Sequence, residues 1–314
     1  MPEHTNKMLK TMEHKVFIVI PVHNRKSITL KCLETLAQNG DLAKFSVVVV
    51  DDGSTDGTSA AIQERFPQVH ILQGDGNLWW TGAICLGMKY AIANGAEYLI
   101  WLNDDCYPQK GTLDKLLNYC LKDQHLVIGG NTLDYSTKRT LYSGFRFYPY
   151  PPTLIPSLAV SESLVDCHAL NGNVVCFHKS LVDTIGYPNP YCFPHYGGDI
   201  MYTFKANKNN FKLRICTSAI AFSFDNAVPS KPLSILSSKQ EIIQSIQQKF
   251  SIKSSTYWQA ELGIYWTLYG LKGLLYRVVS ILAVTILVIL LPRKLREYLQ
   301  KPIMHIYNKV RYVL

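Results

Sequence analysis

The sequence predicts an α/β fold in which a mostly parallel, Rossmann-like sheet is flanked by helices. Short apolar runs rich in β-branched residues are bounded by turn residues, as buried strands are. Segments with apolar residues at helical spacing alternate with these runs, and this alternation is typical of parallel strands covered on both faces. Polar clusters follow several runs, at the carboxyl ends of the expected strands, where such sheets bind ligands.

The first half of this pattern, residues 15–122, is the most regular. Helices are expected to begin near residue 26, after Asp56 and near residue 82, with Gly40 as the C-cap of the first. The strands are expected at residues 16–22, 45–52, 69–74 and 96–102. This order places PVHN, DDGSTDG, GDGNLWW and NDD at one edge of the sheet.

The second half, residues 123–230, is less regular. The proline- and tyrosine-rich stretch 142–157 is predicted to be a surface loop and edge region, because proline does not fit a central strand. A strand and a helix are expected within residues 167–186. A turn, a helix that ends near Asn209 and a further strand follow up to residue 216.

The formal net charge of +9 lies entirely near the C-terminus. Residues 231–314 hold 12 basic and 3 acidic side chains, whereas the first 230 residues hold 20 of each. The same segment contains the longest apolar run, 278–291, which argues against nucleic-acid binding. This run has 14 residues, and a membrane-spanning helix needs about 20. We expect a basic helical tail that associates with an anionic membrane surface; a core helix buried on the folded part is the alternative.

Cysteine usage and the N-terminus indicate the compartment. The eight cysteines form no C-x-x-C pair, so we expect them to be reduced. Residues 1–14 read as a polar leader without the apolar core of an export signal. We therefore expect a peripheral or monotopic protein on the cytoplasmic face of the inner (plasma) membrane, and an oligomer is compatible with the sequence.

Asp104 and Asp105 stand side by side after the strand expected at 96–102. Two carboxylates this close repel each other unless a cation or N–H groups relieve the charge. Mn²⁺ and Mg²⁺ prefer oxygen ligands, often one or two carboxylates together with diphosphate oxygens. The alternative is a solvated loop or a helix cap.

A second pair, Asp51 and Asp52, ends the strand expected at 45–52. A carboxylate there can accept hydrogen bonds from a uracil- or thymine-type base or from ribose hydroxyls. Gly53 allows a tight turn beside such a ligand. A helix N-cap within residues 54–56 would use other side chains, so both roles are compatible.

Taken in order, segments 16–36, 47–58, 74–105 and 194–213 resemble the successive blocks of family 2 glycosyltransferases. The resemblance is to the bacterial branch that builds surface polysaccharides and O-antigens, including rhamnosyltransferase-like enzymes. It covers residues 15–216 and excludes the tail. It implies a GT-A fold over residues 15–230, with a nucleotide-binding half (15–122) and an acceptor half (123–230) before the tail at 231–314.

The resemblance also implies roles for individual residues. Asp52 would contact the base, Asp104 would lie near the ribose, and Asp105 would hold Mn²⁺ or Mg²⁺ on the diphosphate. Asn103 stands where the family more often has a further aspartate. The residues implied to line the nucleotide sugar are Pro21, His23, Asn24, Asp52, Asn77 and Asp104.

Asp199 matches the general base of the family. An inverting transfer needs a carboxylate that takes the proton of the acceptor hydroxyl, across the sugar from the diphosphate. A helix N-cap is the alternative role for Asp199. Trp80, His195 and Tyr196 are further candidate substrate contacts, and core packing is the alternative for Trp80.

Together these residues predict an inverting glycosyltransferase that moves a sugar from a nucleoside-diphosphate donor to a glycan or lipid-linked glycan acceptor. We expect it to act in cell-surface polysaccharide biosynthesis. The alternative is a catalytically inactive, nucleotide-sugar-binding scaffold protein of a polysaccharide assembly complex. The presence of Asp52, Asp104, Asp105 and Asp199 together favours the enzyme.

Overall fold

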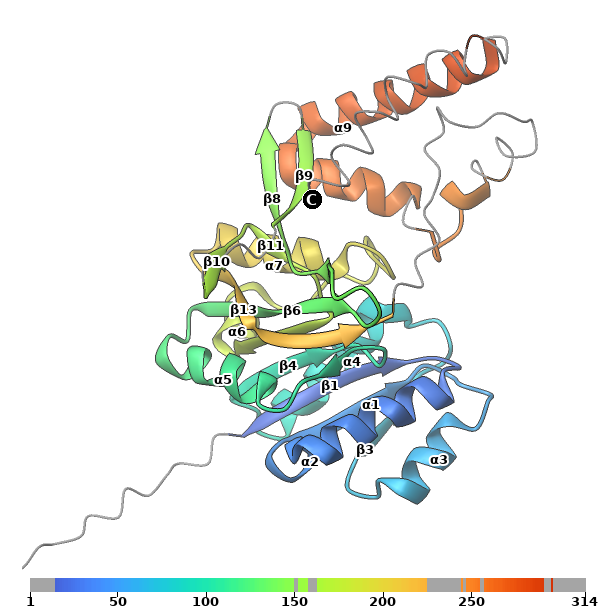
Figure 1. Ribbon diagram of the computed structural model, residues 1–314. Helices are drawn as coiled ribbons and strands as arrows, with labels where there is room; N and C mark the ends of the chain where they lie inside the picture. The colour runs from blue at the N-terminus through green and yellow to red at the C-terminus, as the bar shows by residue number, and fades with distance from the viewer. Residues whose placement is uncertain are drawn as a thin grey trace, which may run out of the picture.

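The computed structural model describes residues 15–149, 152–157, 163–224, 244, 247–254, 257–290 and 295. A central sheet with helices on both faces forms the larger part, and a helical hairpin lies at one end of the molecule, at the top of Figure 1. The predicted leader, residues 1–14, and most of the basic tail after residue 290 lie outside the described residues.

The central sheet is parallel in its first half and mixed in its second, with the strand order β10-β13-β6-β12-β4-β1-β2-β3. β1, β2, β3 and β4 run parallel, as the sequence predicts, whereas β12 is antiparallel to both β4 and β6. β5 and β7 pair with β13 and β6 off the main order. The strand bounds are β1 Val16–Val22, β2 Ser46–Asp51, β3 His70–Gln73, β4 Tyr98–Leu102, β5 Tyr107–Pro108, β6 Leu126–Asp134, β7 Thr140–Tyr142, β10 Leu164–Asp166, β12 Val174–His178 and β13 Lys212–Ser223.

Helices cover both faces because the strand side chains alternate between two cores. On β1, Ile18 and Ile20 pack with α1, α3 and α5, whereas Phe17 and Val19 pack with α4 and α7. Gly40 has φ +81° and ends α1, and Asn209 caps α7, so both predicted helix ends are confirmed. The helix bounds are α1 Lys26–Asn39, α2 Asp41–Lys44, α3 Thr58–Arg65, α4 Trp79–Ala93, α5 Thr112–Lys122, α6 Ser180–Ile185 and α7 Gly198–Lys208.

The stretch 142–157, expected to be a surface loop and edge region, contains a β-hairpin. β8 (Gly144–Pro149) and β9 (Pro152–Ser157) pair antiparallel, and β11 (Ala169–Leu170) completes a small sheet in the order β11-β8-β9. The loop prediction was wrong because residues 144–149 and 152–157 form paired strands, whereas the predicted edge region is confirmed. Here β9 is an edge strand, which tolerates proline.

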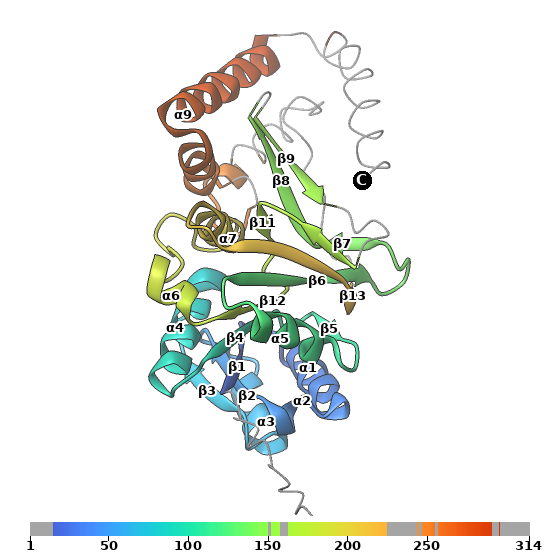
Figure 2. The ribbon, with the colours of Figure 1, turned by 90° about the vertical axis from the view of Figure 1, so that its left-hand side faces the viewer.

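The helix α9 (Trp258–Leu290) turns back on itself at Gly270, where φ is +63°. Its first half packs Ala260, Ile264 and Leu268 against Phe193 and Met201. Figure 2 shows the hairpin beyond α7 and beside β8 and β9. Across the part of the chain that the structure describes, no helix is long and apolar enough to cross a membrane.

Candidate active site

The turns after β1 and β2 are locked together at the carboxyl edge of the sheet. The backbone oxygen of Asp52 lies 2.5 Å from His23 Nδ1. Asn24 donates its backbone N–H to Ser54 Oγ at 2.8 Å, and its Oδ1 accepts the N–H of Thr55 at 2.7 Å. Asn24 adopts φ +52°, a left-handed conformation that asparagine tolerates better than most residues. These hydrogen bonds hold the two turns, residues 21–24 and 51–55, together as one rigid surface, which we call the floor of the site.

Asp52 fixes the loop that follows β3. It is buried, and its Oδ1 and Oδ2 accept the backbone N–H groups of Gly76 and Trp79 at 2.8 and 2.9 Å. A Cβ on Gly74 would lie only 2.5 Å from Asp52 Oδ1. The loop can therefore come this close to Asp52 only because residue 74 is a glycine. Asn77 is exposed in this loop, and Pro21 is buried within β1 opposite Val50. Contact of these residues with a nucleotide sugar stays a prediction.

The acidic pair after β4 faces an arginine that the sequence analysis missed. Arg25 Nη1 lies 3.2 Å from Asp104 Oδ1, and its Nη2 lies 2.8 Å from Asp105 Oδ2. Thr29 Oγ1 donates to Asp104 Oδ2 at 3.1 Å. Burial raises the pKa of Asp104 to about 7, although Arg25 acts in the opposite direction. The sequence did contain one indication that Arg25 belongs to the site, because Arg25 directly follows the PVHN turn.

The donor set of this pair suits a hard divalent cation. No group of three or more histidine, cysteine, aspartate or glutamate side chains within the described ranges could hold a metal ion. Asp104 and Asp105 alone supply two carboxylates, and Mg²⁺ typically binds through one or two carboxylates plus water and phosphate oxygens. The residues therefore fit such an ion when a phosphate ligand accompanies it. Asn103 is engaged elsewhere, since its amide bonds Trp80 and Asn173.

Asp199 lies in the first turn of α7 and is held by a backbone group. Its Oδ2 accepts the N–H of Gly172 at 2.6 Å. Gly197 is the N-cap of α7 and no side chain caps the helix, so the alternative role of Asp199 as N-cap is wrong. Burial raises the pKa of Asp199, and the N–H of Gly172 opposes that rise.

Trp80 connects Asp199 to the acidic pair. A Cβ on Gly172 would lie 2.5 Å from Trp80 Cζ2 and 3.0 Å from Asp199 Cβ, so these three residues are in close contact. Trp80 Nε1 donates to Asn103 Oδ1 at 2.8 Å, next to Asp104. Trp80 also packs edge-on against Trp101, which supports the packing role without testing a substrate contact. No sequence pattern predicts that Gly172 lies this close to Trp80 and Asp199.

His195 and Tyr196 lie in an aromatic cluster with Trp79. The rings of Trp79 and His195 are 5.7 Å apart, and those of His195 and Tyr196 are 4.6 Å apart. Lys253, from a segment with no motif, places its Nζ 5.9 Å from the Trp79 ring. Burial, and then the charges of Lys253 and Arg25, lower the pKa of His195. The lowered pKa favours the neutral form of His195.

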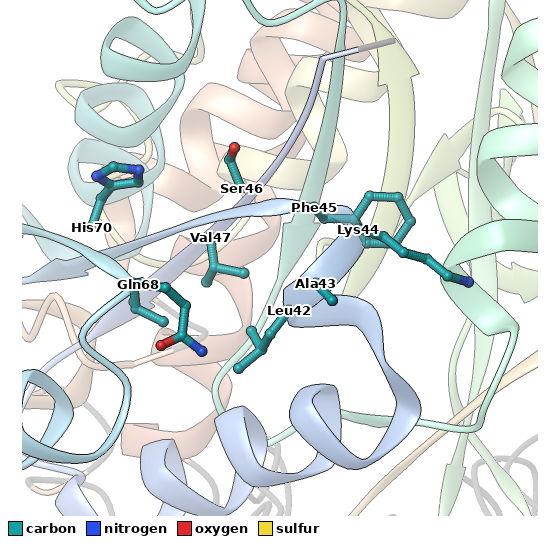
Figure 3. Close-up of a pocket in the computed structure, with 9 residues that line it drawn as sticks. Leu42, Ala43, Lys44, Phe45, Ser46, Val47, Gln68 and His70 are labelled. Atoms are coloured by element: carbon teal, nitrogen blue, oxygen red, sulfur yellow. The ribbon is translucent and has the colours of Figure 1, made fainter. Parts of the chain in front are cut away.

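A pocket elsewhere in the molecule is separate from this site. Figure 3 shows it at the amino ends of β2 and β3, the opposite end of these strands from the acidic pair. It encloses about 220 Å³, and its lining residues are Leu42, Ala43, Lys44, Phe45, Ser46, Val47, Gln68, Val69 and His70. None of the predicted site residues lines it.

Comparison with known sequences identifies relatives of the chain. A family model described as glycosyl transferase family 2 matches residues 17–195. Glycosyltransferase AglE of Haloferax volcanii is 24% identical over 230 residues, which cover 72% of this chain and 70% of that protein. An undecaprenyl-phosphate mannosyltransferase of Micrococcus luteus is 28% identical over 166 residues, which cover 49% of this chain and 64% of that enzyme. The match thus spans less than two thirds of the second relative.

Solved structures share the fold at low sequence identity. GalNAc-T7 with UDP, GalNAc and Mn²⁺ superposes with a TM-score of 0.56 at 12% identity, over 74% of this chain and 48% of that one. S. aureus TarS 1–349 in complex with UDP-GlcNAc gives a TM-score of 0.55 at 15% identity, over 86% of this chain and 81% of that one. These likenesses confirm the predicted GT-A fold.

Proposed function

The chain belongs to glycosyl transferase family 2, whose members act on nucleotide sugars, and we propose that it is an inverting enzyme of cell-surface polysaccharide biosynthesis. In this proposal, a sugar moves from a nucleoside-diphosphate donor to a glycan or lipid-linked glycan acceptor. The observation that carries the proposal is the contact path from Asp199 through Gly172 and Trp80 to Asn103, beside Asp104. It connects the proposed base to the pair proposed to bind a cation, within one site.

The acidic pair belongs to the leaving-group side of the reaction. Asp104 and Asp105 would hold Mn²⁺ or Mg²⁺, which neutralises the charge that develops on the departing diphosphate. GalNAc-T7, a structural neighbour, was solved with Mn²⁺ and UDP. The floor formed by the PVHN and DDGST turns lies beside the pair, because Arg25 directly follows Asn24. That floor is the proposed position of the nucleoside.

Asp199 belongs to the acceptor side. Its carboxylate is held by the N–H of Gly172, which fixes its direction before an acceptor arrives. Burial raises its pKa, and a higher pKa makes the carboxylate a stronger proton acceptor. In the proposed reaction, Asp199 takes the hydroxyl proton as the acceptor oxygen bonds to the anomeric carbon and the bond to the diphosphate breaks.

The C-terminal hairpin supports a membrane location. Four large apolar side chains recur at helical spacing on the second half of α9 and are more than half exposed: Leu271, Leu275, Val279 and Leu282. The sequence that follows, residues 291–314, holds six Lys and Arg side chains and one acidic side chain. We propose that the chain associates peripherally with the anionic cytoplasmic leaflet of the plasma membrane. The Micrococcus luteus relative, named for undecaprenyl phosphate, supports a lipid-linked acceptor.

The proposal is tested by presenting purified protein and Mn²⁺ with UDP-, GDP- and dTDP-sugars. We expect slow hydrolysis of one donor, with inverted anomeric configuration detected by NMR, and loss of this activity when EDTA is added. An Asp199→Asn variant should bind the same donor and hydrolyse it about 10²-fold more slowly, or slower still. If no donor is bound or hydrolysed, the proposed function is wrong; binding without any turnover would favour the scaffold alternative.

A further inference from the structure

Arg25 holds both carboxylates of the acidic pair at once. Its two terminal nitrogens reach different aspartates, Asp104 at 3.2 Å and Asp105 at 2.8 Å. The family resemblance implies that Asp104 lies near the ribose and that Asp105 holds a cation on the diphosphate, and it implies no role for Arg25. The arginine fork therefore occupies oxygen atoms that a divalent cation would need.

Within this cluster, Arg25 is the partner that can move. The side chain of Asp104 is 4% exposed, and Thr29 Oγ1 fixes its second oxygen at 3.1 Å. The side chain of Arg25 is 36% exposed and extends from the residue before α1. A long, flexible, partly solvated side chain can swing away without disturbing a core. The buried carboxylate of Asp104 cannot move in this way.

We propose that Arg25 is a resident counter-cation that competes with divalent metal for Asp104 and Asp105, and that it releases them to a metal ion only when a diphosphate arrives. This inference rests on the proposed function, because it assigns the pair to a metal and a diphosphate. Arg25 thereby acts as a positioning residue that makes metal binding depend on the donor.

The charges at the site explain this dependence. When both carboxylates are ionised, they and the guanidinium carry a net charge of −1, whereas the same groups with a divalent cation would carry +1. Arg25 and the metal ion would then repel each other at short range. A diphosphate adds negative charge that both cations can share, and a guanidinium binds phosphate through paired hydrogen bonds. Arg25 can therefore exchange a carboxylate for a phosphate partner.

Mn²⁺ binding to the full chain, measured by electron paramagnetic resonance without nucleotide, tests the competition. We expect Arg25→Gln to bind Mn²⁺ about tenfold more tightly than wild type, because the competing charge is gone. Arg25→Lys, which keeps the charge but loses the fork, should lie between the two. Lys26→Gln, at the neighbouring residue, should match wild type. A merely structural role for Arg25 would not raise affinity for a metal.

Repeating the titration with UDP, GDP and dTDP tests the release. With the diphosphate that binds, the difference in Mn²⁺ affinity between wild type and Arg25→Gln should shrink severalfold. Equal or weaker Mn²⁺ affinity in Arg25→Gln would overturn the competition, and a gap unchanged by the bound diphosphate would overturn the release. Failure of all three diphosphates to bind would count against the proposed function instead. The nucleotide-free titration still tests the competition in that case.

Discussion

The central sheet and the C-terminal segment, meaning the described residues from 244 onward, contribute to the candidate site in different ways. The sheet and the helices that cover it supply short carboxylates whose oxygens are fixed by neighbours, such as Asp104 by Thr29 and Asp199 by Gly172. The C-terminal segment supplies one long side chain, Lys253, over the ring of Trp79. Fixed groups near reacting atoms determine rate, because small misplacements there are costly. We therefore expect chemistry to depend on the sheet and affinity or location to depend on the C-terminal segment.

The largest effect should come from the acidic pair. Asp105→Asn removes one of the two carboxylates proposed to hold the metal ion, so charge on the leaving diphosphate would be poorly neutralised. We expect kcat/KM to fall about 10³-fold, measured with the donor that wild type accepts. Asp114→Asn, a surface aspartate paired with Lys44, is the control and should stay within about twofold of wild type. An Asp105→Asn variant with a tenth of normal activity would contradict the metal role.

The second effect concerns the proposed base. Asp199→Asn removes the proton acceptor and nearly preserves shape. We expect kcat to fall about 10²-fold or more, while calorimetry gives a donor Kd close to wild type. Retained turnover would move the base elsewhere, and His195 would be the next candidate.

The pH dependence of Asp199 distinguishes catalysis from stability. Burial raises its pKa above the ordinary 3.8, and a base works in its ionised form, so kcat/KM should fall about tenfold per pH unit below the raised pKa. The folded state favours protonated Asp199, so the stability it contributes is lost as pH rises through that pKa. Asp199→Asn should therefore have a higher Tm than wild type at pH 8. If the residual kcat/KM of Asp199→Asn still falls at low pH, a group other than Asp199 causes the fall, and Asp104 would be the first candidate.

These residues also show how far sequence alone leads. Asp52, Asp104 and Asp199 could be placed because two of them end or follow apolar strands and all lie in ordered family blocks. The alternation of strand and helix brought their turns to one edge of the sheet, as the structure confirms for the turns after β1, β2 and β4. Such inferences work because the direction of parallel strands fixes where their ends lie.

Other contacts depend on tertiary packing that no local pattern encodes. Gly172 acts through its backbone N–H and through the lack of a side chain, neither of which distinguishes it from other glycines in a sequence. Lys253 comes from a polar stretch and reaches Trp79 because α9 packs on Phe193 and Met201. Long-range placement of this kind follows from the fold of the whole chain.

Lys253 gives the first test of the C-terminal segment. Its Nζ lies over Trp79, whose backbone N–H is bound by Asp52, so the charge is placed beside the proposed donor floor. We expect Lys253→Ala to raise the KM for the donor about fivefold with kcat nearly unchanged. Lys272→Ala, an exposed lysine on α9, is the matched control and should leave both constants unaltered. A large fall in kcat would place Lys253 in the chemistry and break the comparison between the two regions.

The smallest effect on chemistry should come from the exposed apolar face of α9. Leu275, Val279 and Leu282 are 56%, 62% and 55% exposed, and they lie on the half of the helix beyond Gly270, away from the packed contacts of the first half. Because these side chains are more than half exposed, replacing all three by Gln should change donor affinity and Tm little. The same change removes the apolar surface proposed to enter the headgroup region, so binding to vesicles with 30% anionic lipid should fall about tenfold in a sedimentation assay. Leu121→Gln, at an exposed leucine of α5, controls for the loss of apolar surface as such and should sediment like wild type. Vesicle binding that survives the triple substitution would assign attachment to other residues, whereas a loss of donor binding would show that this face of α9 supports the site.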